Sequence, residues 1–247
     1  MADDDRRRAQ AVSFGAAAAA YERGRPPYPP QAVDWLLPAG ASRVLDLGAG
    51  TGKLTRQLHS RGLDVIAVEP LPGMREQLAR AVPGVSVRAG TGEDIPLEDA
   101  SVDAVLVAQA WHWMDTARAS AEAARVLRPG GRLGLVWNLR DERADWVAAL
   151  SRLLRDPGER EDGESRGRVG PPFGPVERFT VDWTHRLSAD ELVDMVASRS
   201  YVITMPEAQR AAVLADVRAL VAEHPDLAGA DVITLPYVTH CFRGQHP

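Results

Sequence analysis

The stretch from residue 44 to 55, Val-Leu-Asp-Leu-Gly-Ala-Gly-Thr-Gly-Lys-Leu-Thr, constrains this chain more than any other. A short apolar run of strand type contains an acid, Asp46, and then breaks into Gly48, Gly50 and Gly52 at alternate positions. A helical apolar pattern follows directly. The stretch therefore predicts a strand, a tight turn and a helix.

The glycines of this turn indicate a ligand. Without a Cβ atom they permit positive φ and let a ligand lie directly on the main chain. A helix that opens near Gly52 directs free N–H groups and the positive end of its dipole toward a carboxylate or phosphate. Two known nucleotide patterns fail here: Lys53 follows the wrong glycine spacing for a phosphate-binding loop, and it occupies the third glycine position of the dinucleotide fingerprint. The pattern that remains is Asp-x-Gly-x-Gly-x-Gly.

This pattern resembles the first motif of class I methyltransferases that depend on S-adenosylmethionine (SAM). Two other segments carry the same resemblance. Residues 124–133, Ala-Arg-Val-Leu-Arg-Pro-Gly-Gly-Arg-Leu, are similar to the motif that precedes the fifth strand of this family. The pattern F-x(6)-Y-x-x-x-Arg-Pro-x-Tyr-Pro from residue 14 and the pair His112-Trp113 resemble the branch of type 11 and trans-aconitate methyltransferases, which act on small molecules.

Strand and helix patterns alternate along the chain and predict an α/β fold with a mostly parallel sheet and helices on both faces. The resemblance implies a Rossmann-like sheet of seven strands with the last strand antiparallel, and an N-terminal helical lid. Strands are expected at residues 44–47, 64–69, 85–89, 102–108, 132–138, 179–185 and 232–243. Helices are expected at residues 14–21, 31–37, 72–82, 117–127, 144–154, 188–199 and 206–223, and from about residue 52. Pro236 within the closing strand indicates a bulge or an edge.

Length and composition favour one domain. We expect a disordered tail at residues 1–12 and a single domain at residues 13–247, with a lid segment at 13–30 and a mobile loop at 156–175. The net charge of −5 gives no reason to expect nucleic acid or a membrane as partner. The single cysteine, Cys241, permits no internal disulfide and no cysteine cluster for zinc, so we expect no metal and a cytoplasmic location.

Glu69 is the first site residue that its position predicts. A carboxylate at the tip of the strand beside a glycine turn is placed to accept hydrogen bonds from two ribose hydroxyls. Met74 follows nearby, where its thioether could lie against an adenine face or belong to the core. The resemblance implies that Asp46 and the glycines hold the amino-acid end of SAM, and that residues 91–93 hold the adenine. The full set expected to bind the cofactor is Tyr21, Asp46, Gly48, Ala49, Gly50, Gly52, Glu69, Pro70, Met74, Thr91, Gly92, Glu93, Ala108 and Gln109.

Aromatic residues follow the fourth strand, where an open α/β sheet binds its ligands. Tyr21, Trp111 or Trp113 would stabilise a sulfonium by cation–π contact. His112 is the candidate catalytic residue, either as a base or as a residue that shapes the pocket. A carboxylate acceptor would need no base, and Arg25 would bind it. The residues expected at the substrate are Phe14, Arg25, Tyr28, Trp111, His112, Trp113 and Trp137.

These expectations lead to one favoured function and two alternatives. The favoured function is SAM-dependent methyl transfer to an O, N or C nucleophile of a small metabolite by in-line displacement, in a monomer or homodimer. The first alternative is a SAM-binding protein of the same fold with a regulatory or other role without methylation. The second is a nicotinamide-dependent oxidoreductase, which the glycine spacing argues against.

Overall fold

The computed structural model describes residues 26–154, 165–203 and 205–247. The predicted tail 1–12 and helix 14–21 lie outside the described residues, as do most of the predicted lid, residues 156–164 of the predicted loop, and the side chains Phe14, Tyr21 and Arg25. Among the described residues, no helix is long and apolar enough to cross a membrane.

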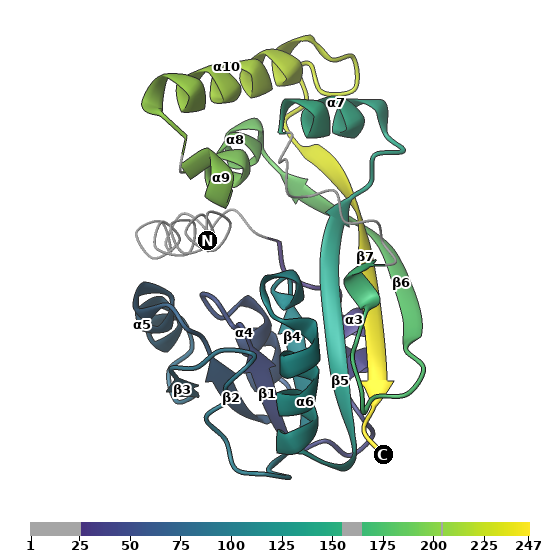
Figure 1. Cartoon of the computed structure of the whole chain (residues 1–247). Helices are drawn as coiled ribbons and strands as arrows, with labels where there is room; N and C mark the ends of the chain where they lie inside the picture. The colour runs from purple at the N-terminus through teal and green to yellow at the C-terminus, as the bar shows by residue number, and fades with distance from the viewer. Residues whose placement is uncertain (1–25, 155–164, 204) are drawn as a thin grey trace. The chain divides into compact units, whose positions relative to one another are not determined.

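Seven strands form one sheet in the order β3-β2-β1-β4-β5-β7-β6 (Figure 1). Their bounds are β1 Arg43–Leu47, β2 Asp64–Val68, β3 Ser86–Arg88, β4 Val102–Ala108, β5 Leu127–Arg140, β6 Glu177–Leu187 and β7 Ile233–Gln245. The pairs β1–β2, β1–β4, β2–β3 and β4–β5 are parallel. The last strand is antiparallel: just past its end, His246 exchanges backbone hydrogen bonds with Gly130 and Gly131 near the start of β5. The predicted fold class is confirmed.

The helices include α6 in front of the parallel strands and α3 behind them, as Figure 1 shows. Their bounds are α3 Pro30–Leu36, α4 Lys53–His59, α5 Pro72–Ala81, α6 Thr116–Val126, α7 Asp145–Leu153, α8 Ala189–Ala197, α9 Ser200–Ile203 and α10 Glu207–Glu223, with short 3-10 turns at Trp111–Trp113 and Ser165–Gly167. The helix α8, within the range expected to be helical at 188–199, begins with a capping box in which Ser188 and Glu191 satisfy each other's backbone N–H groups.

The chain divides into two compact units, and the divisions fall within β5, β6 and β7. One unit, described at residues 27–138, 165–181 and 239–247, holds the glycine turn and the parallel strands. The other, described at residues 139–154, 182–203 and 205–238, has its own apolar core around Trp146, Leu192 and Val217. The prediction of a single domain at residues 13–247 stays a prediction.

Two local expectations require correction. Residues 128–131 were expected to form a turn before the fifth strand, but they bulge from within β5. Val102 pairs with Leu127, and Ala104, only two residues on, pairs with Arg132. Gly130 accommodates the bulge with φ of +77°. Pro236 was expected to indicate a bulge or an edge; the edge is wrong, because β7 lies between β5 and β6, and the bulge stays a prediction.

Candidate functional site

The glycine turn joins β1 to α4. Gly48, Gly50 and Gly52 have φ of +71°, +56° and +93°, which a residue with a side chain rarely adopts. A Cβ on Gly48 would lie 2.7 Å from the Cβ of Ala110, whereas a Cβ on Gly50 would meet no atom of the described residues within 4 Å. Gly48 is therefore required by packing as well as by conformation, and Gly50 faces open space in which a ligand fits against the backbone.

Asp46 is fully buried in β1, directly before this turn. Its Oδ2 accepts a 2.6 Å hydrogen bond from the Thr55 hydroxyl, and its buried Oδ1 has no hydrogen-bond donor among the described residues. Burial raises the pKa of Asp46 to about 7, although the Thr55 hydrogen bond opposes the rise. A buried oxygen without a donor fits a cofactor that presents an amino group here, because an unsatisfied buried acceptor is costly.

Glu69 lies at the end of β2 and is 6% exposed. Its Oε2 accepts from the backbone N–H of Gly50 and its Oε1 from that of Leu71, both at 3.0 Å. Burial raises the pKa of Glu69, while the two N–H groups act in the opposite direction. The structure thus brings Glu69 to the glycine turn, as its sequence position predicted. Each carboxylate oxygen has the capacity to accept a further hydrogen bond in addition to these, so the residue fits a ribose diol.

The loop at residues 90–97, expected at the adenine, folds back on itself through a bridge between Thr91 and Asp94. Gly92 packs against the Met114 side chain, and the Glu93 carboxylate accepts from the backbone N–H of Asp115 at 2.7 Å. The methyl of Met114 also lies 3.4 Å from where a Cβ of Gly48 would be. Met114 therefore touches both loops, and no motif in the sequence pointed to it.

Of the other residues expected at the cofactor, Met74 and Ala49 are buried, and Pro70 is exposed. Ala108 ends β4, and Gln109 after it adopts φ of +57°, an uncommon conformation for a residue other than glycine. The Gln109 side chain donates to the backbone carbonyl of Asn138. Strain of this kind clusters at functional sites, and nothing in the sequence indicated it.

Asn138 connects Gln109 to residues 26–30, the described end of the predicted lid. Its side-chain NH₂ donates to the Pro27 carbonyl at 3.1 Å, and its side-chain oxygen accepts from the Thr239 hydroxyl at 2.6 Å. Asn138 is 8% exposed, so both groups are satisfied away from water. Nearby in sequence, the backbone N–H and carbonyl of Tyr28 pair with the Gln57 amide.

The aromatic residues expected at the substrate fall into two groups. Trp111 and Trp137 are both 2% exposed: the Trp111 indole N–H donates to the Arg168 carbonyl at 2.9 Å, and Trp137 packs edge-on against Phe242. His112 and Trp113 are exposed, with ring centroids 4.8 Å apart. Tyr28 is also buried, at 7% exposed, so of these five described residues His112 and Trp113 are the two that a solute reaches without rearrangement.

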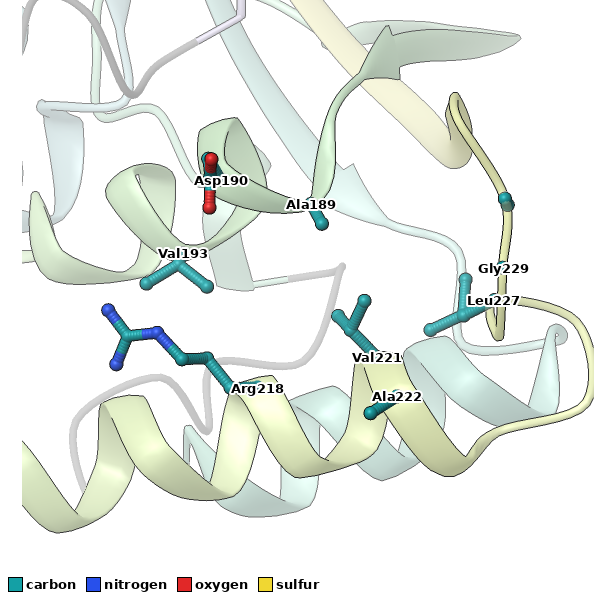
Figure 2. Close-up of a pocket in the computed structure, with 9 residues that line it drawn as sticks. Ala189, Asp190, Val193, Arg218, Val221, Ala222, Leu227 and Gly229 are labelled. Carbon is teal, nitrogen blue, oxygen red and sulfur yellow. The ribbon is translucent and has the colours of Figure 1, made fainter.

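A separate hollow lies between α8 and α10, and Figure 2 shows its lining. Its charged residues are Asp190 and Arg218, and the remainder are glycine or apolar. None of the residues predicted for the cofactor or substrate lines it. In the described part of the chain, no group of three or more His, Cys, Asp or Glu side chains is arranged to hold a metal ion, and the expectation of no metal stays a prediction.

Comparison with known proteins finds similar sequences and a similar structure among methyltransferases. Residues 45–135 match a family described as a methyltransferase domain. An uncharacterized methyltransferase of Mycobacterium tuberculosis is 57% identical over 237 residues, covering 96% of this chain and 97% of that protein. An uncharacterized methyltransferase-like protein of Schizosaccharomyces pombe is 36% identical over 245 residues, covering 94% and 95%. The solved structure of a putative type II methyltransferase from Anaeromyxobacter dehalogenans is similar with a TM-score of 0.69 and 28% identity, covering 90% of this chain and 97% of that one.

Proposed function

Since this chain belongs to the class I SAM-dependent methyltransferases, we propose that it transfers a methyl group from SAM to an oxygen, nitrogen or carbon nucleophile of a small metabolite. The observation that carries the assignment of the site is the pair of buried carboxylates, Asp46 and Glu69, at the ends of two adjacent strands beside the glycine turn. One of them has a buried oxygen with no donor among the described residues.

The residues of this site divide the work of binding. Asp46 would bind the amino group of SAM, and the N–H groups at the start of α4 would bind its carboxylate. Glu69 would bind the ribose hydroxyls, and residues 91–93 the adenine. A cationic amine beside Asp46 favours the ionised carboxylate, so Asp46 would lose its proton as the ligand binds near neutral pH.

When bound, SAM supplies an electrophilic methyl group on a sulfonium whose leaving group is a neutral thioether. The protein therefore needs no acid for the leaving group, and its main task is to align the acceptor and exclude water. His112 would take a proton from a hydroxyl or amine acceptor, or only shape the pocket if the acceptor is a carboxylate. Phe14, Tyr21 and Arg25 remain part of this proposal from the sequence alone, as do the location in the cytoplasm and the monomer or homodimer.

Calorimetric titration tests the assignment. Wild-type protein, Asp46→Asn and Glu69→Gln are titrated with SAM, with S-adenosylhomocysteine and with NAD. We expect the wild type to bind the two adenosyl ligands and not NAD, and each variant to lose at least about tenfold in affinity, since each removes a charge-assisted hydrogen bond. Asp103→Asn is the matched control, because Asp103 lies near the start of β4, away from the glycine turn.

Two results would count against the proposal in different ways. Folded wild-type protein that binds neither adenosyl ligand would exclude the site. Protein that binds SAM without ever releasing S-adenosylhomocysteine, over a panel of hydroxyl, amine and carboxylate metabolites, would favour the alternative of a SAM-binding protein that does not methylate.

A further inference from the structure

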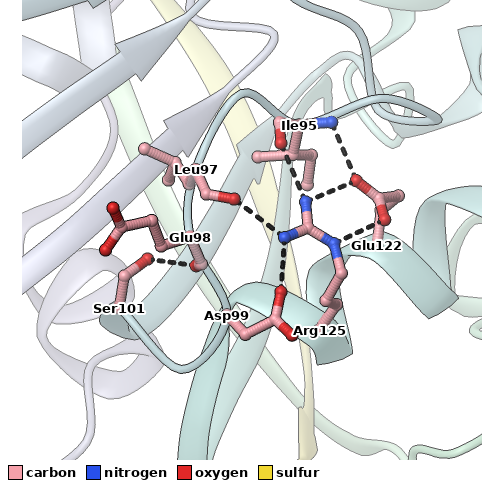
Figure 3. A network of polar contacts seen from close by, with 7 residues as sticks. All are labelled: Ile95, Leu97, Glu98, Asp99, Ser101, Glu122 and Arg125. Atoms are coloured by element: carbon pink, nitrogen blue, oxygen red, sulfur yellow. Dashed lines mark hydrogen bonds and ion pairs between the residues drawn. The ribbon is translucent and has the colours of Figure 1, made fainter.

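Arg125 on α6 uses every N–H of its guanidinium (Figure 3). Its Nε donates to Glu122, its Nη1 to the Leu97 carbonyl and to Asp99, and its Nη2 to the Ile95 carbonyl and to Glu122, all at 2.7 or 2.8 Å. Two of these five acceptors are backbone carbonyls of the loop at residues 90–97. An ion pair confined to one helix surface would not reach them, so this arginine joins α6 to the loop.

Glu122 completes the connection. Its Oε2 accepts from the backbone N–H of Ile95 at 2.9 Å as well as from Arg125. Both backbone groups of Ile95 are therefore held by the Arg125–Glu122 pair, as a neighbouring strand would hold them. The Ile95 side chain is 2% exposed and Leu97 is 9% exposed, which fixes this leg of the loop from the core side too. Asp99 is 78% exposed and contributes least.

The other leg of the same loop is held at the opposite end of α6. Asp115 caps this helix through a hydrogen bond from Arg118, and its own backbone N–H donates to Glu93. Gly92 lies between, packed against Met114. The two legs of the loop are thus held by polar contacts near the two ends of one helix.

We propose that Arg125, together with Glu122, is a positioning residue that holds the loop at residues 90–97 in the shape that receives the adenine end of SAM. This inference rests on the proposed function. Without the pair, the loop must be ordered when the ligand binds, and the cost of ordering appears as weaker affinity. The reacting atoms are untouched, so the KM for SAM rises while kcat at saturating SAM stays the same.

The test measures the Kd for SAM and for S-adenosylhomocysteine, and both kinetic constants, in Arg125→Gln and Arg125→Lys. Arg128→Gln is the matched control: Arg128 also forms an ion pair, with Asp103 at 2.6 Å, and has a similar exposed fraction of 42% against 32%. We expect Kd to rise about tenfold in Arg125→Gln and nearly as far in Arg125→Lys, because an ammonium cannot reproduce the five-donor fork. Arg128→Gln should stay within about twofold of wild type.

The proposed function and the positioning role of Arg125 are contradicted by different results. If the wild type binds neither ligand, the proposed function falls and this inference with it. If the wild type binds but Arg125→Gln stays within about twofold, matches the shift of Arg128→Gln, or loses kcat instead of affinity, the inference alone is overturned. If Arg125→Gln does not fold, Glu122→Gln decides by the same criteria, since the amide keeps one acceptor oxygen and its NH₂ group cannot accept the second hydrogen bond from Arg125.

Discussion

Two aspartates on the neighbouring strands β4 and β1 lie at opposite ends of the parallel strands, and their carboxylates are held in opposite ways. Asp103, near the start of β4, accepts hydrogen bonds from Ser42, from the Arg43 N–H and from Arg128. Burial by itself would raise its pKa, but these donors outweigh burial and lower the pKa to about 2. Asp46, near the end of β1, has one side-chain donor and a pKa raised by burial to about 7. At the amino ends of the strands the protein itself supplies the hydrogen-bond donors of Asp103. At the carboxyl ends Asp46 keeps an acceptor oxygen that a ligand can use.

The largest expected effect concerns the pH dependence of stability at Asp46. Its pKa is about 7 in the folded protein against 3.8 ordinarily, so the folded state binds the proton more tightly than the unfolded state does. The stability that this proton contributes is fully present below about pH 4 and is lost as the pH rises through 7. Relative to Asp46→Asn, the free energy of unfolding of wild type should fall by about 4 kcal/mol between pH 4 and 8. Urea denaturation across this range measures it. Parallel pH profiles of the two proteins would contradict the buried, poorly satisfied carboxylate.

Glycine substitutions compare the packing at the two ends of the parallel strands. Gly48 and Gly130 have nearly equal φ, +71° and +77°, but a Cβ would lie 2.7 Å from Ala110 at the first and meet nothing within 4 Å at the second. Gly48→Ala should lower the free energy of unfolding by about 2–4 kcal/mol, and Gly130→Ala by about 1 kcal/mol, which is the conformational part alone. Chemical denaturation of both variants gives the difference. Equal losses would mean that the turn yields to a methyl group at no cost.

Asp103→Asn should show a pH dependence of the opposite sign. Because the pKa of Asp103 is depressed to about 2, its contribution is present above about pH 4 and is lost as pH falls toward 2. The variant should be about 1–2 kcal/mol less stable than wild type at pH 6, and the gap should close in acid. Thermal unfolding at pH 6 and pH 3 provides the measurement. A gap that persists unchanged at low pH would mean that packing, rather than charge, is what the substitution removes.

The smallest effect is expected for Arg128→Gln, which removes one partner of Asp103 at a site where the arginine is 42% exposed. Its cost in stability should be below about 1 kcal/mol. Asp103 keeps its backbone donors, so the acid dependence above should survive in this variant. Losing that dependence together with Arg128 would show that the guanidinium, and not the backbone N–H groups, holds the carboxylate ionised.

The elements that could be predicted from the sequence are those specified by local pattern. The fourth strand was predicted at 102–108 and is observed there, because residues 104–108 form a continuous apolar run that Asp103 alone separates from Val102. The positions of Asp46 and Glu69 beside the glycine turn followed from strand ends and spacing. The helix expected from residue 188 begins at Ala189, directly after its N-cap Ser188, because Ser188 and Glu191 form a local capping box.

The features that escaped prediction depend on contacts between segments distant in sequence. Met114 matters because it touches Gly48 and Gly92, and Arg125 because it reaches two carbonyls about thirty positions away. The positive φ of Gln109 is set by its contacts with the neighbouring strand, and no sequence rule points to it. The bulge at residues 128–131 looked like a turn since both use the same glycines, and only the pairing with β4 distinguishes them.

The close approach of Gly48 and Ala110 also has an evolutionary consequence. The gap between the two turns holds a single methyl group, and Ala110 already supplies it. The two positions therefore form an epistatic pair. With alanine at position 110, a methyl group at position 48 is disfavoured both by the positive φ and by the clash with the Ala110 methyl group. After Ala110→Gly, only the positive φ disfavours it. Gly48→Ala is therefore better tolerated when Ala110→Gly precedes it, so the order of these substitutions, and not only their combined effect, is constrained.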